Sequence, residues 1–281
     1  MRIDEIRNVL ACPACRSELE WKATGPVCGK CGKHYEYRNG KVFFILPNTD
    51  KQIRNWYDKL KYHFKRYKRF YRFLMKLFAP VCSTSRRDLK RWLNDAGGKV
   101  LIDIGSGVRK IDERLIGIDI FEYAGVDIVA DASVLPFKDG SVDGLVNIAV
   151  LEHVKNPETM VSEFHRVLKP GGKFFVFVPF LQGYHASPTD YFRWTEQGCG
   201  RLFSAFSRVR VHTAQGPASS LLWVFQEWFA VTFSFYSKFL YKVLLILVSL
   251  VTFPFKYLDF LLVRHPMAKN AAAGFYIFGK K

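Results

Sequence analysis

Short apolar runs alternate with polar stretches through the middle of the chain. Each run has the length of a buried strand, about four to eight residues. The predicted strands are residues 99–104, 115–120, 126–130, 142–148 and 173–180. Because short strands that alternate with crossovers form parallel sheets, the pattern predicts an α/β fold with a mostly parallel sheet.

Residues 157–168 carry the clearest helical pattern between these strands. Pro157 suits the first turn and Glu158 the positive N-terminal end, while Gly171 and Gly172 stop the helix. The apolar residues that share one face are Met160, Val161, Phe164, Val167 and Leu168. The segment is therefore predicted to be an amphipathic crossover helix.

Residues 216–264 are strongly apolar, and the thirteen residues 243–255 carry no charge. That run is shorter than the roughly 20 residues that span a bilayer. Residues 273–279 predict a last strand that pairs with a strand near 209–213. Both must lie in one sheet, which excludes a single span between them. The alternatives are an interfacial or re-entrant helical insertion, a hairpin of two spans, or a lid over the substrate.

Charge is concentrated outside the predicted sheet. The chain has 42 Lys and Arg against 25 Asp and Glu, a net charge of +17, which indicates a negatively charged partner. Residues 51–76 hold ten Lys or Arg and one acid, interleaved with aromatic residues. A helix of this composition suits an anionic membrane surface or RNA. The alternative is a solvated helix packed on the main domain.

Two Cys-x-x-Cys pairs stand near the N-terminus, separated by twelve residues. They are Cys12 with Cys15 and Cys28 with Cys31. Two such knuckles can complete a tetrahedral zinc site, and four thiolates leave no open position for catalysis. We therefore expect structural zinc; unligated buried cysteines or two disulfides are the alternatives. Residues 1–10 contain acids and no long apolar run, so we expect no secretory signal and a cytoplasmic location.

Polar residues follow the ends of the first three predicted strands. Gly105-Ser106-Gly107 ends the first strand and permits a close ligand approach. Asp119 ends the second strand, where an acid can accept both ribose hydroxyls. Asp131 and Ala132 end the third, where a carboxylate and a backbone N–H can bind adenine. A nicotinamide dinucleotide is disfavoured because Lys110 replaces the third glycine of G-x-G-x-x-G.

The runs DIGSG, GID, VADASVLPFKDGSVDGLV, LEHV and FHRVLKPGGKFFVFVP resemble the methyltransferase family that includes the ubiquinone and menaquinone biosynthesis enzymes. The resemblance covers residues 99–203 and implies a Rossmann-like seven-stranded sheet with S-adenosylmethionine as cofactor. It implies that Asp103, Gly105 and Gly107, with Ser106 between them, lie under the methionine part. It also implies that Asp119 holds the ribose, that Asp131 and Ala132 hold the adenine, and that Asn147 and Ile148 face the sulfonium. Residues 9–47 resemble the zinc ribbon of the tRNA-methyltransferase activator family.

The chain departs from this family in its first two crossovers. Ten residues separate Ile104 from Leu115, and five separate Ile120 from Val126. A parallel crossover normally needs a dozen residues or more, so the first helix is expected to shrink to a turn. A helix N-terminus can then no longer bind the methionine carboxylate. We expect Arg109 to supply the missing positive charge.

Loops after the fourth and fifth strands hold the candidates for acid–base catalysis. They are His153, His185, Asp190 and Arg193. The alternative is structural: His153 as a helix cap, and Asp190 with Arg193 as a loop ion pair.

The predicted organisation is a zinc ribbon (1–48), a basic aromatic helical linker (49–97) and a methyltransferase domain (98–281) with an apolar helical insertion (216–270). We predict O- or C-methylation of a small or lipid-linked acceptor by a peripheral enzyme at the inner face of the membrane. An RNA methyltransferase and a non-catalytic, membrane-associated scaffold are the alternatives.

Overall fold

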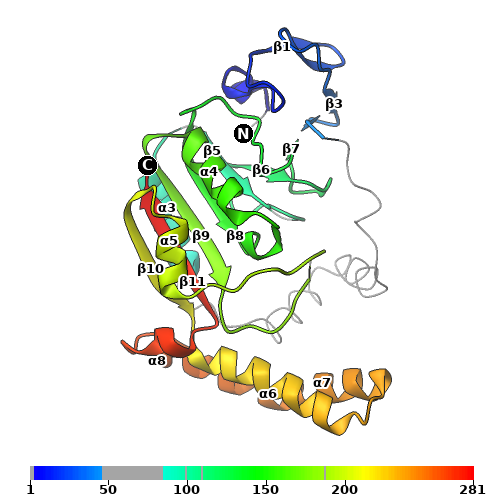
Figure 1. Ribbon diagram of the computed structural model, residues 1–281, viewed down its shortest axis with the longest axis vertical. Coiled ribbons are helices and arrows are strands. Elements are labelled where there is room, and N and C mark those ends of the chain that lie inside the picture. The colour runs from blue at the N-terminus through cyan, green and yellow to red at the C-terminus, as the bar shows by residue number, and fades with distance from the viewer. Residues whose placement is uncertain (1–2, 46–84, 99, 109, 187) are drawn as a thin grey trace.

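The computed structural model describes residues 3–45, 85–98, 100–108, 110–186 and 188–281 (Figure 1). Most of the predicted basic aromatic linker, including residues 51–76, lies outside the described residues, and so does Arg109.

A nine-stranded sheet forms the centre of the molecule, in the order β10-β11-β9-β8-β5-β6-β7-β4-β3. Its parallel strands are β5 (Leu101–Ile104), β6 (Leu115–Asp119), β7 (Ile128–Val129), β8 (Val142–Ile148) and β9 (Leu168–Pro179). The strands β10 (Ser207–Gln215) and β11 (Gly274–Lys280) pair antiparallel at one edge. The predicted parallel α/β sheet and the predicted pairing of the last strand are confirmed.

Seven strands of this sheet, β5 to β11, come from the predicted methyltransferase domain, and two strands from the N-terminal region extend the other edge to give nine. These two are β3 (Glu36–Arg38) and β4 (Lys41–Phe43), and β4 runs parallel to β7 with Val42 beside Ile128. Val42 and Phe43 are buried there, so the burial of apolar surface stabilises the hairpin at the edge of β7. The hairpin formed by β1 (Leu19–Lys22) and β2 (Gly25–Cys28) remains a separate two-stranded sheet.

Helices cover both faces of the central sheet (Figure 1). On one face α4 (Pro157–Val167) and α5 (Glu196–Leu202) pack over a core that includes Phe164, Phe174 and Phe203. A short helical segment, η1 (Ile3–Val9), adds Ile3 and Ile6 to the same core. On the other face α3 (Ser85–Ala96) places Leu89, Trp92 and Leu93 against β5, β8 and β9.

The first two crossovers are turns, as their lengths predict. Among the described residues between β5 and β6, and between β6 and β7, there is no helix. The backbone N–H groups of Gly105 and Ser106 donate to the carbonyl of Ile118, at 2.7 and 3.1 Å. The side chain of Asp127 accepts from the Gly117 N–H at 2.8 Å. These bonds tie each short loop directly to β6.

Residues 217–262 form an antiparallel helical hairpin that leaves the sheet between the end of β10 and the start of β11, beside the end of β9 (Figure 1). Its arms are α6 (Pro217–Phe233) and α7 (Lys238–Thr252), and α7 continues through η4 (Phe253–Leu258) and α8 (Asp259–Leu262). A last short segment, η5 (Ala268–Ala271), leads into β11. We call residues 217–262 the apolar hairpin.

Candidate functional site

The carboxyl ends of β5, β6 and β8 bring together three polar side chains that the sequence analysis singled out. In the sheet register, Asp103 lies beside Gly117 and Val146, and Ile104 lies beside Asn147. Asp119 follows one residue after the pairing of Ile104 with Ile118. Asp103 is 2% exposed and Asn147 is fully buried, so the side chains of this edge lie inside the protein.

Buried polar atoms without a hydrogen-bond partner gather at this edge. Among the described residues eight buried side-chain atoms lack such a partner, and three of them lie here. The three are Asp103 Oδ2, Ser106 Oγ and Asn147 Oδ1. Native proteins leave few such atoms unsatisfied, because each one costs about 1–3 kcal/mol. Their concentration at one place indicates a site for a polar ligand.

The electrostatics of this edge disfavour two full negative charges. Burial, and then the neighbouring charge of Asp119, raise the pKa of Asp103 to about 7. Burial also raises the pKa of Asp119, against the opposing effect of the backbone N–H groups of Phe121, Gly107 and Ile120. A ligand that brings positive charge or hydrogen-bond donors would therefore stabilise both carboxylates.

Asp119 fixes the glycine turn and retains acceptor capacity. Its Oδ2 accepts from the Gly107 N–H and its Oδ1 from the Phe121 N–H, both at 3.0 Å. Each oxygen has a second lone pair for a ligand. Gly105 is required sterically: its φ is +79°, and a Cβ there would lie 2.1 Å from Cγ2 of Val150. This contact brings the loop after β5 against the loop after β8.

The other predicted cofactor residues border this edge or lie outside the described residues. Asp131 is exposed just beyond β7, where its Oδ1 accepts from the Ser133 N–H at 2.8 Å; Ala132 follows it, half-buried. Ile148 ends β8. Arg109 has no described position.

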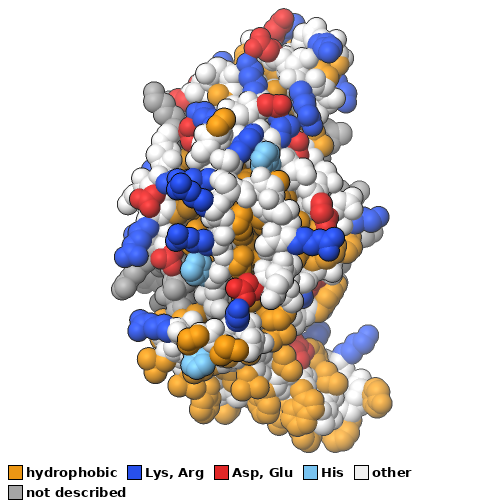
Figure 2. All heavy atoms as spheres, turned by 60° about the vertical axis from the view of Figure 1, so that its left-hand side comes forward, with side chains coloured by type: hydrophobic (Ala, Val, Ile, Leu, Met, Phe, Trp, Pro, Cys, Tyr) orange, Lys and Arg blue, Asp and Glu red, His pale blue; other side chains and the backbone are white. Residues whose placement is uncertain are grey.

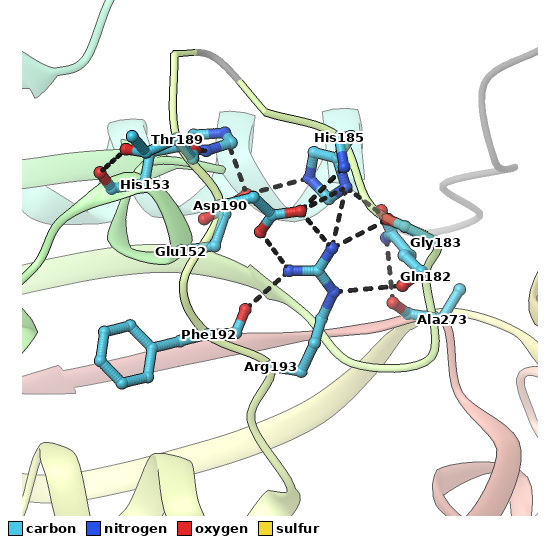
Figure 3. Close-up of polar contacts among 10 residues, drawn as sticks. All are labelled: Glu152, His153, Gln182, Gly183, His185, Thr189, Asp190, Phe192, Arg193 and Ala273. Atoms are coloured by element: carbon cyan, nitrogen blue, oxygen red, sulfur yellow. Dashed lines mark hydrogen bonds and ion pairs between the residues drawn. The ribbon is translucent and has the colours of Figure 1, made fainter.

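A second group of polar side chains lies just after β8 (Figure 3). A short helical segment, η3 (Leu151–His153), presents Glu152 and His153, and the loop after β9 presents His185. Nε2 of His185 lies 3.6 Å and Nε2 of His153 lies 3.9 Å from Oε1 of Glu152. The chain enters this segment through Ala149 at a φ of +55°, a strained conformation that is typical of functional sites.

Arg193 and Asp190 hold the loop that carries His185. The guanidinium donates to both oxygens of Asp190 and to the carbonyls of Gln182, Gly183 and Phe192. The hydrogen bonds from Arg193, with a smaller effect of the His185 N–H, lower the pKa of Asp190 to about 2 against the opposing effect of burial. The five N–H bonds of Arg193 are all used. The geometry therefore contains the loop ion pair that the sequence analysis named as the structural alternative.

Glu152 was not a candidate in the sequence analysis. In the run LEHV it resembles a solvated carboxylate at the start of a helix, yet it is fully buried. The sequence carries no local sign of this burial. The loop after β9 lies against the residue, where the Tyr191 N–H donates to the Glu152 carbonyl at 2.7 Å.

The four ribbon cysteines converge as their spacing predicts. Their Sγ atoms all lie within 4.8 Å of one another, with Cys12 and Cys31 at 3.7 Å and Cys15 and Cys28 at 3.4 Å. The Cys31 N–H points to Sγ of Cys28 at 3.4 Å, and Oη of Tyr35 lies 3.0 Å from Sγ of Cys12. These contacts suit thiolates.

An open groove elsewhere is lined by α3, β10 and β11 and is rich in Arg and Lys. None of the predicted cofactor or acid–base residues lines this groove. The candidate site is therefore identified by its buried polar chemistry, and the groove is a separate feature.

Residues 91–176 match the family described as "Methyltransferase domain". A probable S-adenosylmethionine-dependent methyltransferase of Mycolicibacterium smegmatis is 34% identical over 107 residues, which cover 32% of this chain and 42% of that protein. A ubiquinone/menaquinone biosynthesis C-methyltransferase of Acidiphilium cryptum is 34% identical over 93 residues, 30% of this chain and 34% of that protein.

Among solved structures, a SAM-dependent methyltransferase from Archaeoglobus fulgidus aligns with 75% of this chain and 100% of its own, at 16% identity and a TM-score of 0.45. The chain spans less than half the length of the two curated relatives named above.

Proposed function

We propose that this chain, whose residues 91–176 form a methyltransferase domain, is an S-adenosylmethionine-dependent methyltransferase. The observation that carries the proposal is the group of buried, unpartnered polar atoms at the carboxyl ends of β5 and β8. Asp103 and the turn Gly105-Ser106-Gly107 would hold the methionine part, and Asp119 the ribose. Asp131 and Ala132 would hold the adenine, with Asn147 and Ile148 on the sulfonium side.

The cofactor fits the electrostatics of this edge. S-adenosylmethionine brings an activated methyl group on a positively charged sulfur and a positively charged amino group. These charges would favour the ionised forms of Asp103 and Asp119, whose pKa values are raised without the ligand. The protein then has to align the acceptor with the methyl group and exclude water.

A thermal-shift comparison of three ligands tests this assignment. S-adenosylmethionine and S-adenosylhomocysteine should raise the Tm by several degrees at 100 times Kd, which corresponds to about 2.7 kcal/mol of added stability. NAD⁺ should leave the Tm unchanged. An equal rise with NAD⁺, or no rise with either methyl-cofactor form, would contradict the proposal.

The four cysteines of the ribbon would hold structural zinc. A tetrahedron with zinc–sulfur bonds of about 2.3 Å has edges of roughly 3.8 Å, and two of the observed sulfur–sulfur distances are 3.4 and 3.7 Å. Four thiolates would fill the coordination sphere, so the expected role is to stabilise the fold.

We further propose that the apolar hairpin places the enzyme on a membrane surface. Large apolar side chains are exposed along both arms and at the tip (Figure 2). The most exposed include Leu221, Val224, Trp228 and Val231 on α6, Phe235 and Tyr236 at the tip, and Phe239, Leu247 and Val251 on α7. Soluble monomers seldom expose so large an apolar surface.

The topology excludes a single membrane span by the apolar hairpin. Residues Lys238–Leu262 form a helix of 25 residues that is long and apolar enough to cross a bilayer by length and composition alone. Its most apolar 18-residue window has a mean hydropathy of 1.8 and is 28% buried. The strands before and after the hairpin, β10 and β11, pair in one sheet, so its two ends lie on one side of any membrane. Lys238 and Lys242, close to the tip, can reach anionic headgroups.

The base of the hairpin also contacts the candidate site. The ring of Trp223 on α6 lies 5.8 Å from the ring of His185, and a Cβ at Gly183 would lie 2.2 Å from Nε1 of Trp223. An apolar acceptor that enters from the membrane along α6 would arrive beside His185. This arrangement supports a lipid-like acceptor.

Co-sedimentation with vesicles of phosphatidylglycerol and phosphatidylcholine tests the membrane proposal. A triple tip variant, Phe235→Ser, Tyr236→Ser and Phe239→Ser, should lose at least ten-fold in vesicle binding, because these rings are 79%, 105% and 78% exposed. The control pair Ile111→Ser and Val134→Ser, which changes exposed apolar residues elsewhere, should bind like wild type.

Wild-type protein that stays fully in the supernatant at low salt would contradict membrane association. Binding to RNA in preference to the vesicles would favour the RNA methyltransferase alternative instead.

A further inference from the structure

Three side chains that can bind a metal converge beside the proposed cofactor site. The ligand atoms of Glu152, His153 and His185 all lie within 4.8 Å of one another. Glu152 and His153 come from η3, and His185 comes from the loop after β9 (Figure 3). The group is separate in sequence from the ribbon cysteines and contains no sulfur.

In the neutral form of both histidines, the contacts with backbone carbonyls place the ring proton on Nδ1, so that Nε2 is the nitrogen that can bind a metal. Nδ1 of His153 lies at the carbonyl of Thr189, and Nδ1 of His185 lies 2.9 Å from the carbonyl of Gly183. A carbonyl only accepts, so Nδ1 carries the proton in each ring. Arg193 also lies 3.2 Å from Nδ1 of His185, but its five N–H bonds already go to other acceptors.

Each Nε2 therefore presents its lone pair toward Oε1 of Glu152. A backbone carbonyl that holds Nδ1–H and orients Nε2 is the usual support behind a metal-binding histidine. Arg193, held by Asp190, donates to the Gly183 carbonyl and fixes its position. The ligand atom of His185 is therefore preorganised for metal binding.

Glu152 supplies the negative charge of the group. Its side chain is fully buried, and neither of its oxygens has a hydrogen-bond partner among the described residues. A buried carboxylate needs a hydrogen-bonded partner or a cation. The separations of 3.6 and 3.9 Å between Oε1 and the two Nε2 atoms are close to the roughly 3.3 Å between ligands that bind one ion at about 2.0–2.1 Å.

We propose that Glu152, His153 and His185 bind a divalent transition metal ion that receives the oxygen of a hydroxyl-bearing acceptor. Two imidazoles and one carboxylate suit Zn²⁺, Fe²⁺, Mn²⁺ or Co²⁺ better than Ca²⁺ or Mg²⁺, which prefer oxygen ligands. Three protein ligands leave coordination positions open. The metal site follows from the side chains alone; its role toward an acceptor rests on the proposed methyltransferase function.

The position of the site suits that role. Val150, which directly precedes η3, is in contact with the Gly105 turn at the proposed cofactor position. A hydroxyl oxygen bound to the metal would lose its proton to water more easily. An oxygen lone pair would then form a bond to the methyl carbon as the carbon–sulfur bond breaks. The electron pair of the carbon–sulfur bond would stay on sulfur, giving S-adenosylhomocysteine with a neutral sulfur.

Metal content tests the site without reference to activity. The full chain is dialysed against Co²⁺ and the bound metal is measured per chain. Wild type should hold one equivalent more than Glu152→Gln, His153→Gln or His185→Gln, whose affinity for this ion should fall at least ten-fold. The control His265→Gln changes an exposed histidine outside the group and should match wild type.

The visible spectrum of Co²⁺ keeps the test valid if a variant fails to fold. The second equivalent in wild type should add absorption without the intense thiolate charge-transfer bands of the ribbon site. Equal metal content in wild type and folded variants, or thiolate bands for every equivalent bound, would overturn the proposal and leave a proton-mediated pair of Glu152 with the histidines.

Thermal shift with S-adenosylmethionine on the same samples separates the two proposals. Loss of the extra metal with an unchanged cofactor shift overturns only the metal site. An additional equivalent of Co²⁺ in wild type, without a rise in Tm on adding S-adenosylmethionine, would support the metal site and contradict the methyltransferase role.

Discussion

At the scale of single residues, the buried carboxyl group of Asp103 makes the stability of the protein depend on pH. Its pKa is about 7 in the folded protein and about 3.9 in an unfolded chain. Between these values the folded state binds more protons, so this group lowers stability as pH rises from 4 to 7, with no further effect above that range. The full effect is on the order of 2–4 kcal/mol.

Asp103→Asn should remove most of this decline. We expect the free energy of unfolding, measured with urea on the ligand-free proteins, to fall between pH 4.5 and 8 in wild type. In the variant it should fall much less over the same range. A wild-type pH dependence retained by the variant would show that Asp103 is ionised throughout.

The sequence identified part of the candidate site residue by residue. Asp103, Asp119 and Asn147 could be named because a parallel sheet places the ends of its strands at one edge. Glu152 could not, because a carboxylate next to a histidine gives no local sign that a distant loop will bury it. Arg193 was named as a catalytic candidate, and the structure shows its N–H bonds committed to Asp190 and three carbonyls.

At the scale of elements, the apolar hairpin begins with a cap that comes from its other arm. Both oxygens of the fully buried Asp259 accept from the first turn of α6, from the Ala218 and Ser219 N–H groups at 2.8 Å each. This bond joins α6 to α8 across the base of the hairpin. It satisfies N–H groups that a helix otherwise leaves unpaired.

Asp259→Ala should therefore loosen the base of the hairpin. We expect a loss of about 1–2 kcal/mol and faster hydrogen exchange of the Ala218 and Ser219 amides. Asp259→Asn, which keeps one acceptor, should show a smaller loss. Unchanged exchange in the alanine variant would mean that packing alone holds α6 in place.

The elements were predictable where the pattern is local. The strands from residue 99 to residue 180, the helix that starts at Pro157 and the last strand follow from periodicity and from the proline in the first turn. The expected stop at Gly171 and Gly172 is wrong, because the helix ends at Val167 and both glycines lie within β9. The pairing of β4 with β7 did not, because a parallel contact between Val42 and Ile128 leaves no signal in either segment. A hairpin was one of the alternatives for the apolar insertion, but the position of its turn was not predicted, since Ser234–Ser237 lacks glycine and proline.

At the scale of the whole molecule, the ribbon and the central sheet share structure. The Ala11 N–H donates to the Pro136 carbonyl, the Lys138 N–H donates to the Val9 carbonyl, and β4 extends the sheet. Loss of the zinc proposed for the ribbon should therefore lower the stability of the whole protein.

Treatment with a strong chelator, or Cys28→Ser, should shift a single cooperative unfolding transition to lower temperature. The shift should be the same by tryptophan fluorescence and by far-ultraviolet circular dichroism. Cys199→Ser, which alters a buried cysteine away from the ribbon, serves as the control that keeps its zinc. Two separate transitions would show that the ribbon folds independently of the sheet.

The central claim is that one cofactor binds at the carboxyl ends of β5, β6 and β8, and calorimetric titration with S-adenosylmethionine tests it most directly. We predict one site per chain in wild type, at least ten-fold weaker binding in Asp119→Ala, and unchanged binding in Asp139→Ala, a change of an exposed acid on another loop. Equal affinity in wild type and Asp119→Ala, or no binding heat in wild type at several temperatures, would contradict the account.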